Sequence, residues 1–243
     1  MRKKLLILGL ALLHFAAFAG GEKFQINFHI SPNGEWLWFS GSPSSSFYNS
    51  SFGTKLSYNV GLEYKRFFDP SLSLSIGALY MNKGFRNKDP FDPSQITLYS
   101  SHMAALPISL NIHQDITRRT EMIYSLGIVP GYSFSERVRS SLYSGEDNPT
   151  EGLFDLADSK GNIDLLNDVY LGAALGIGIS TYLKSRVVMV IQPTFKFQLN
   201  NAHDYLGIFI PGDPVAMRMN SFGVDFKIGY FFTKQVRNRT KDI

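Results

Sequence analysis

The amino-acid sequence predicts an all-β protein, an eight-stranded antiparallel transmembrane β-barrel with short periplasmic turns and long external loops. Three observations indicate this fold class. The chain opens with an export signal, its later residues alternate between apolar and polar side chains, and its connections alternate between short and long. Strict two-residue alternation is typical of strands whose two faces meet different surroundings.

The composition of the 243-residue chain excludes several classes of site. It contains no cysteine, so disulfides, thiolate metal sites and cysteine nucleophiles are excluded. Charged residues make up 18% and aromatic residues 14%, which is too apolar for a disordered chain. Without Arg2, Lys3 and Lys4, 21 basic residues stand against 20 acidic ones. The sequence therefore gives no reason to expect nucleic acid as a partner.

The N-terminus predicts a signal peptide over residues 1–20. Basic residues precede an apolar run from Leu5 to Phe18, and Ala17 and Ala19 supply the small side chains that a signal peptidase selects. The run is shorter than the roughly 20 residues of a membrane-spanning helix. We expect an outer-membrane β-barrel over residues 21–233, followed by a basic periplasmic tail over residues 234–243.

The alternation is clearest in three runs, residues 55–67, 72–80 and 221–232. In the first run, Leu56, Tyr58, Val60, Leu62 and Tyr64 share one face, and Lys55, Ser57, Asn59, Gly61, Glu63 and Lys65 share the other. Five weaker runs of the same kind cover residues 22–31, 96–113, 120–135, 168–182 and 186–200. Each of the eight is long enough to cross a bilayer at a tilt.

The connections favour a membrane barrel over a soluble sandwich. Those at residues 68–70, 114–119 and 183–185 are short, and those at residues 32–54, 84–95, 136–167 and 201–219 are long. Strict alternation places every short turn at one end of the barrel and every long loop at the other. Outer-membrane barrels show this asymmetry.

The alternation alone does not say which face points outward. A soluble periplasmic ligand-binding barrel would turn its apolar face inward. The polar face is rich in glycine, alanine and serine, which suits a narrow interior, and aromatic residues lie near the strand ends, as in interfacial girdles. We therefore expect the apolar face to contact lipid, and a filled lumen that does not conduct solutes. A small porin stays the open alternative.

A lumen charge network is predicted on the polar face. It comprises Lys55, Glu63, Lys65, Lys196, Asp225 and Lys227. We expect Glu63 to pair with Lys55, Lys65 or Lys227, and Asp225 to be paired too, because an unpaired charge in so narrow a lumen is costly.

Three prolines fit this scheme less well. Pro107, Pro130 and Pro193 fall inside predicted strands, and a closed barrel has no free edge where a missing amide is tolerated. We expect bulges there, or strand limits shifted by several residues.

No enzyme, metal or cofactor is expected. His29 and His113 lie on the polar face, and His102 and His203 near loop ends, with no metal-binding spacing. The enzyme alternative is an outer-membrane lipid-modifying hydrolase, for which His102 with Ser100 or Ser101 is the only candidate pair. No Gly-x-Ser-x-Gly element accompanies them.

Short segments resemble known outer-membrane barrels. Residues 221–232 resemble the closing strand that the barrel-insertion machinery reads, with Gly223, Phe226, Ile228, Tyr230 and Phe232 as the implied insertion signal. Leu106-Pro107-Ile108-Ser109-Leu110 and Gln192-Pro193-Thr194-Phe195-Lys196-Phe197 resemble segments of the PorT-like outer-membrane β-barrel domain family of Bacteroidota. The resemblance implies a barrel in outer-membrane lipid that acts as a structural or accessory component of the envelope. Envelope or secretion-complex proteins are its implied partners.

Overall fold

The computed structural model describes residues 24–40, 52–88, 96–141, 153–156, 168–184, 186–202 and 216–232. The predicted signal peptide, the predicted tail and His203 lie outside these ranges. The described residues form eleven strands. They are β1 (Phe24–Ser40), β2 (Phe52–Gly53), β3 (Lys55–Asp69), β4 (Leu72–Lys88), β5 (Ile96–Ala105), β6 (Ile108–Asp115), β7 (Thr120–Ser141), β8 (Leu153–Leu156), β9 (Val169–Tyr182), β10 (Val187–Gln198) and β11 (Ala216–Phe231). No helix in this part of the chain is long and apolar enough to cross a membrane.

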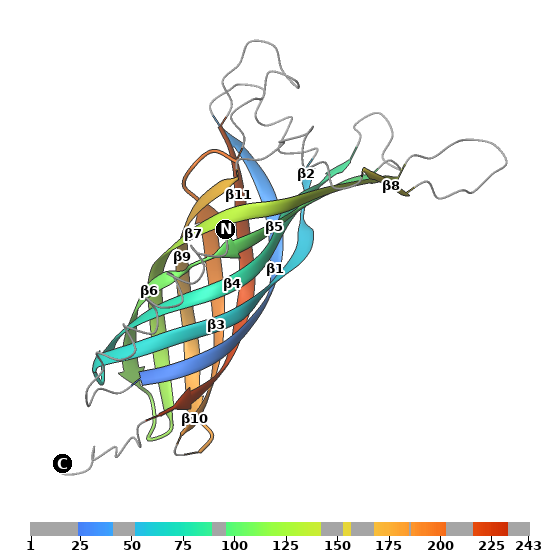
Figure 1. Cartoon of the computed structure of the whole chain (residues 1–243). Coiled ribbons are helices and arrows are strands. Elements are labelled where there is room, and N and C mark those ends of the chain that lie inside the picture. The colour runs from blue at the N-terminus through green and yellow to red at the C-terminus, as the bar shows by residue number, and fades with distance from the viewer. Residues whose placement is uncertain are drawn as a thin grey trace, which may run out of the picture.

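The strands form a closed antiparallel ring, as the alternation predicted (Figure 1). The order around the wall is β4, β3, β1, β11, β10, β9, β7 and β5, and β5 pairs with β4 to close it. β6 occupies the same position as β5, since both pair with β4 and β7. The short strands β2 and β8 extend the sheet at β4 and β7. Closure removes the free edges that a bilayer does not tolerate.

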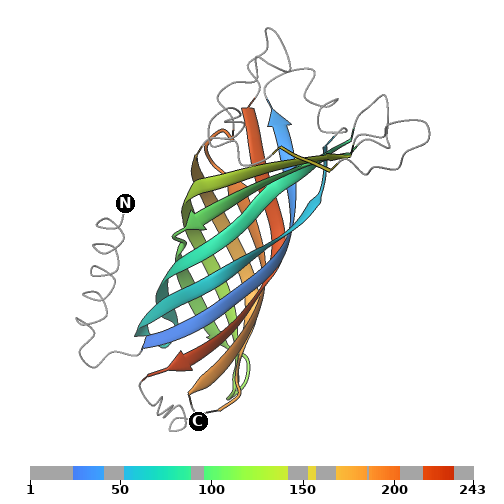
Figure 2. The same ribbon diagram turned by 45° about the vertical axis from the view of Figure 1, so that its right-hand side comes forward.

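The short turns gather at one end of the tilted barrel, as predicted (Figures 1 and 2). They join β3 to β4, β6 to β7 and β9 to β10. The predicted long connections are too long, however, because β1 continues to Ser40, β4 to Lys88 and β7 to Ser141. Pro32 does not end β1, since it stays paired with Tyr58 of β3. The strands at the loop end therefore form a longer wall than the alternation indicated.

The turn between β3 and β4 is closed by Asp69. Its Oδ1 atom accepts hydrogen bonds from the Ser71 hydroxyl and the Ser71 amide, each at 2.6 Å. These bonds hold the pKa of the Asp69 carboxyl below its ordinary value. An aspartate that bonds two residues ahead is a common way of fixing a tight turn.

Pro107 interrupts a strand without shifting its register. β5 ends at Ala105 and β6 begins at Ile108, yet the register against β4 and against β7 is the same on either side of this gap. The Pro107 carbonyl still accepts a hydrogen bond from the Gly77 amide at 2.8 Å. The chain here is one wall strand with a local gap in its ladder, so the expected bulge is wrong.

Pro130 and Pro193 also sit in the wall without bulges. Pro130 stays paired with Leu171 of β9, and its carbonyl accepts from the Leu106 amide at 2.8 Å, inside the gap between β5 and β6. Pro193 stays paired with Val224, while the ladder to β9 skips two residues and then resumes in the same register. Each proline lacks an amide toward only one of its two neighbouring strands, so its pairing with the other strand is kept. The irregularities lie elsewhere, between Phe67 and Asp69 and between His102 and Met103.

The two faces of the wall point as predicted. Apolar side chains face outward, with Leu56 86%, Ile228 60% and Leu126 59% exposed. Polar side chains face inward, with Asn27, Ser31 and Asn59 fully buried. This distribution is the reverse of that in a water-soluble barrel and matches a wall surrounded by lipid.

Candidate functional site in the lumen

The inward side chains of the central strands form a polar layer around Glu63. The Glu63 carboxylate lies on β3, and Lys227 reaches it from β11, with Nζ 2.7 Å from Oε2. Asn27 lies on β1 between these strands and donates its amide to Oε1 at 2.7 Å. Both carboxylate oxygens are thus satisfied by different strands, which offsets part of the cost of burying the charge.

A second carboxylate, Asp225 on β11, lies in the same layer. Thr194 donates its hydroxyl to Oδ2 at 3.0 Å. His29 Nε2 lies 3.2 Å and Lys196 Nζ 3.8 Å from Oδ1. Lys196 also donates to Asn33 at 3.4 Å. Asp225 therefore joins β1, β10 and β11 through one buried group.

Lys65 and Lys55, the other two residues of the predicted network, differ in their placement. Lys65 is 2% exposed and points into the lumen beside Glu63 on β3. Lys55 lies eight residues from Glu63 along the same strand, about 26 Å away, and does not reach it. Its Nζ atom donates instead to Asn82 Oδ1 at 2.8 Å and to the Lys83 carbonyl at 3.3 Å. Of the three lysines expected as partners of Glu63, Lys227 forms the ion pair, and Lys55 is excluded.

The contacts of Lys55 have a structural cause in the wall. The β3–β4 ladder ends at the pair Asn59 and Met81, and the chain pairs with β4 again only at Gly53 and Arg86. Within this stretch, where β3 and β4 form no ladder pair, the Lys55 ammonium bonds the Lys83 carbonyl of β4. Gly84 also has a positive φ of 155° here, a region that favours glycine.

Two buried contacts of carboxylates were not predicted from the sequence. Glu35 on β1 pairs with Lys83 on β4 at 3.1 Å, and both side chains are fully buried. Ser57 donates to Glu35 at 3.1 Å, and the Lys83 ammonium lies 4.5 Å from the centroid of the Tyr170 ring. Lys83 has the inward phase of Ser73 and Ser75, so the alternation contained its signal. Glu35 was missed because the first strand was expected to end at residue 31.

The second of these contacts lies near the turn end. His113 Nδ1 is 3.1 Å from Glu121 Oε2, and His113 Nε2 is 2.8 Å from the Ser73 hydroxyl. Tyr182 donates to the other oxygen of Glu121 at 2.9 Å. His113 is thus a buried hydrogen-bonded histidine on the polar face, where the alternation placed it.

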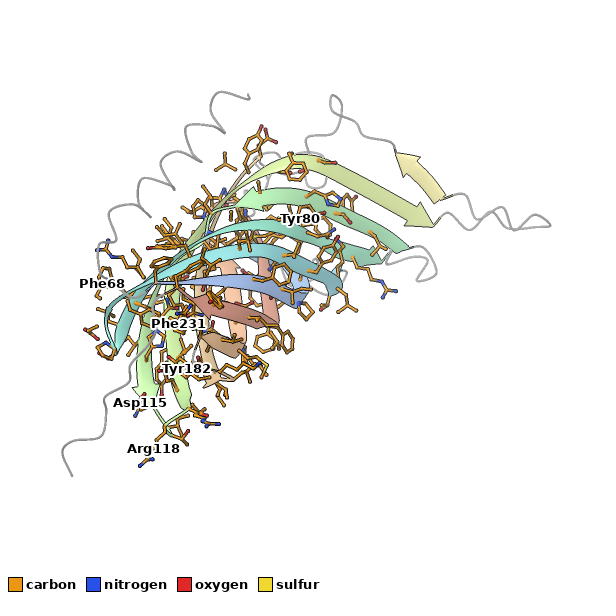
Figure 3. All side chains as sticks on the ribbon, turned by 60° about the horizontal axis from the view of Figure 1, so that its bottom comes forward. Phe68, Tyr80, Asp115, Arg118, Tyr182 and Phe231 are labelled. Carbon is orange, nitrogen blue, oxygen red and sulfur yellow. The ribbon has the colours of Figure 1, made fainter. Side chains whose placement is uncertain are left out.

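Apolar clusters fill the lumen on both sides of the polar layer. The loop-end cluster contains Leu37, Leu79, Met81, Phe85, Met103, Ala105, Val129, Tyr170, Ala202, Met217 and Met219. The turn-end cluster contains Phe67, Ile123, Val188, Val190 and Phe231, with Tyr182 packed against them (Figure 3). In the turn-end cluster the ring of Phe231 lies 5.6 Å from Phe67 and 5.8 Å from Tyr182. Both ends of the lumen are therefore packed with apolar side chains.

A cavity of about 40 Å³ remains within the polar layer. Its lining includes His29, Glu63, Lys196, Asp225 and Lys227. A volume of this size holds about one to three water molecules, and the polar lining offers them partners. The cavity is too small for an organic ligand, since ligand pockets measure roughly 300–1,000 Å³.

In the hydrolase alternative, Ser101 lies on the opposite face of β5 from His102, whereas Ser100 has the same phase as His102 and shares its outer face. Ser101 faces the lumen and shares a hydrogen bond of 2.8 Å with Ser133. His102 faces outward and bonds through Nδ1 to the hydroxyl of Tyr80 (Figure 3). The wall thus separates Ser101 from His102. Among the described residues, no group of three or more histidine, aspartate or glutamate side chains is placed to hold a metal ion.

The residues of the predicted insertion signal lie on β11, which closes the ring against β1. Phe226, Ile228, Tyr230 and Phe232 face outward and are 42–60% exposed. Gly223 faces inward against β1, where an added Cβ would lie 2.1 Å from Asn33 Oδ1 and 2.6 Å from the Pro32 carbonyl. Gly223 therefore has a packing role in the closed barrel. Recognition by the insertion machinery stays a prediction.

A comparison with known families agrees with this geometry. Residues 18–204 match the outer membrane protein beta-barrel domain family. The chain belongs to this family. It is accordingly a protein of the bacterial outer membrane, as the sequence predicted. The match is not specific to PorT-like proteins or to Bacteroidota.

Solved structures with a similar fold are only distantly related in sequence. Neisserial surface protein A is 9% identical with a TM-score of 0.45, over 84% of this chain and 96% of its own. Ail of Yersinia pestis, solved with the heparin analogue sucrose octasulfate, is 11% identical with a TM-score of 0.38, over 86% and 99%. AlkL, solved in lipid bilayers, is 13% identical with a TM-score of 0.39, over 88% and 90%. No curated protein matches the chain.

Proposed function

We propose that this protein is a non-conducting outer-membrane barrel that serves as a structural or accessory binding component of the cell envelope. The observation that supports this function is the filled lumen. An ion on its way through would have to displace the apolar side chains of both clusters and separate the contacts of Glu63 and Asp225. Dehydrating an ion among apolar groups, or leaving a buried charge unpaired, costs several kcal/mol.

A barrel without a pore acts through its ends and its outer surface. At the loop end the described strands extend the wall, and β7 continues to Ser141, where it pairs with β5 and β8 (Figure 1). A paired extension of the wall is suited to presenting a binding surface beyond the membrane. The resemblance of residues 106–110 and 192–197 to PorT-like proteins supports a place in an envelope complex, including one that secretes proteins.

Conductance in planar bilayers tests the proposal. The folded protein, checked by its heat-modifiable migration in gels, should give no steady current over a range of voltages. A known porin inserted into the same bilayers provides the positive control. Stable channels of uniform size from the folded protein would contradict the proposal and favour the small porin.

A further inference from the structure

The outer wall at the turn end carries a connected row of aromatic rings. Tyr64 of β3, Phe24 of β1, and Tyr230 and Phe232 at the end of β11 form this row, which we name the aromatic seam. Phe24 lies 5.9 Å from Tyr64 and 4.9 Å from Phe232, and Phe232 lies 5.4 Å from Tyr230 between ring centroids. Tyr230 is 42% and Phe232 47% exposed. Such rings lie at the depth of the lipid headgroups.

An arginine flanks the seam on each side. Arg66 is the Cα partner of Phe24, and its guanidinium lies 5.8 Å from the centroid of the Phe68 ring. Arg186 Nη1 donates to the hydroxyl of Tyr230 at 3.2 Å. Both guanidinium groups are thus held by girdle rings on the lipid side of the wall. A guanidinium has five N–H donors in a planar fork that matches a phosphate.

The charge around the seam favours an anionic ligand. Among the described residues, Lys184 in the turn between β9 and β10 adds one exposed cation to Arg66 and Arg186, whereas Arg118 and Arg119 lie in the turn between β6 and β7, on the far side of the ring. The exposed described acids at the turn end are Asp69, in the turn beside β3, and Asp115, which is labelled in Figure 3 and ends β6 on the far side. Basic clusters at the membrane surface attract anionic headgroups, and the exposed rings beside them offer an apolar surface for acyl chains.

We propose that the aromatic seam, with Arg66 and Arg186, binds anionic phospholipids of the leaflet on the turn side. The acyl chains pack on the rings of Phe24 and Phe232, and each arginine binds one headgroup phosphate. The two arginines are separated by β1 and β11, and adjacent strands lie about 4.8 Å apart. One monophosphate headgroup therefore does not reach both arginines. This inference rests on the outer-membrane location and is independent of the proposed closed lumen.

Native mass spectrometry of the folded protein in detergent tests this site. Dioleoylphosphatidylglycerol and dioleoylphosphatidylcholine, which share their acyl chains, are added at equal concentration. The wild-type protein should retain the anionic lipid at least about fivefold more strongly, because the choline cation neutralises the phosphate charge of the zwitterionic lipid, whereas phosphatidylglycerol keeps its net negative charge near the arginines. Equal retention of the two lipids by the wild-type protein would overturn the proposal, and this comparison needs no variant.

Substitutions locate the selectivity. Arg66→Gln with Arg186→Gln should reduce it to about the level of the zwitterionic lipid, whereas Arg66→Lys with Arg186→Lys should keep at least half of it. Arg218→Gln, an exposed arginine on the outer wall at the loop end, is the matched control and should change nothing. Every variant is first checked for heat-modifiable migration. An equal loss in the Arg218→Gln variant would contradict the site.

Two further experiments distinguish a lipid from other ligands of the seam. Inorganic phosphate at millimolar concentration should not displace the lipid, because it lacks the acyl chains that pack on the seam. Displacement by phosphate alone would identify a free-anion site and overturn the lipid assignment. Native membranes provide the second experiment: a co-purifying protein that covers the seam in place of lipid would also overturn it.

Discussion

The outward and inward faces of β11 carry opposite chemistry on the same strand. Phe222, Phe226, Ile228 and Tyr230 point to lipid and are 42–60% exposed, whereas Asp225 and Lys227, one position away, are 4% and 6% exposed. In a water-soluble protein the apolar set would be buried and the charged set solvated. Here lipid solvates the apolar set, and the lumen has to satisfy the charged set with its own side chains.

The difference between the faces indicates how each tolerates change. The outer face requires only apolar character, since lipid adapts to any shape. The inner face requires particular partners, because Glu63 has both oxygens bonded and Asp225 is shared by three strands. On the outer face, the most harmful substitutions should be those that replace an apolar side chain by a charged one. On the inner face, they should be those that remove one partner of a buried charged pair.

The largest effect is expected from breaking the central ion pair. Glu63→Gln leaves the Lys227 ammonium buried without its carboxylate, which should cost about 3–5 kcal/mol of unfolding free energy. The double variant Glu63→Gln with Lys227→Met removes both charges and should recover most of this loss. Denaturant unfolding of the refolded protein in micelles measures both. A double variant as unstable as the single one would show that the buried ammonium of Lys227, left without its carboxylate, is not the cause of the loss.

Charge on the outer face should come next. Leu62→Lys or Ile76→Lys places an ammonium against acyl chains and should cost about 2–4 kcal/mol, enough to block assembly into vesicles. The matched inward change, Ser75→Ala, should cost about 1 kcal/mol, because Asn111 Nδ2 keeps a bond to the Ser109 carbonyl at 3.3 Å. Gel migration with and without heating reports folded barrels. Equal tolerance at both kinds of position would contradict the outward assignment of the apolar face.

A methyl group added on the inner face where β11 pairs with β1 should have a moderate effect. Gly223→Ala pushes a Cβ against the Pro32 carbonyl at 2.6 Å and should cost about 1–3 kcal/mol. Gly131→Ala is the control, since its Cβ would meet its nearest atom at 3.4 Å. Stability of refolded protein, measured without the insertion machinery, separates packing from recognition. An unchanged stability of Gly223→Ala would leave recognition as the reason for this glycine.

The smallest effect concerns the turn between β3 and β4. The Ser71 hydroxyl and amide lower the pKa of Asp69, so its contribution is present above the ordinary aspartate pKa of about 4 and is lost as pH falls through the lowered value. The Asp69→Ala variant should therefore match the wild type more closely at pH 2 than at pH 7. Unfolding midpoints at the two pH values measure this. A difference that grows toward low pH would have the wrong sign.

The alternation predicted which side chains point to lipid and which to the lumen, because the face of each side chain depends only on its position along its own strand. Glu63, Lys65, Asp225 and Lys227 are inward by their phase alone. The sequence offered three lysines as partners of Glu63 and did not select Lys227, since that contact depends on how β1 staggers β3 against β11. Lys55 was offered as a partner of Glu63 for the same reason. The effect of the prolines was wrongly predicted. A proline such as Pro193 interrupts the ladder to one neighbouring strand and keeps the register with both. The sequence of a single strand does not show which neighbour lies on that side.

The packed lumen and the lipid-facing wall are tested together by the reactivity of single cysteines, which the natural chain lacks. Leu62→Cys and Ser75→Cys variants in vesicles are treated with a charged and with a lipid-soluble thiol reagent. Leu62→Cys should react only with the lipid-soluble reagent, and Ser75→Cys with neither until the barrel is unfolded. Fast reaction of Ser75→Cys with the charged reagent would reveal a water-filled pore and contradict the closed lumen.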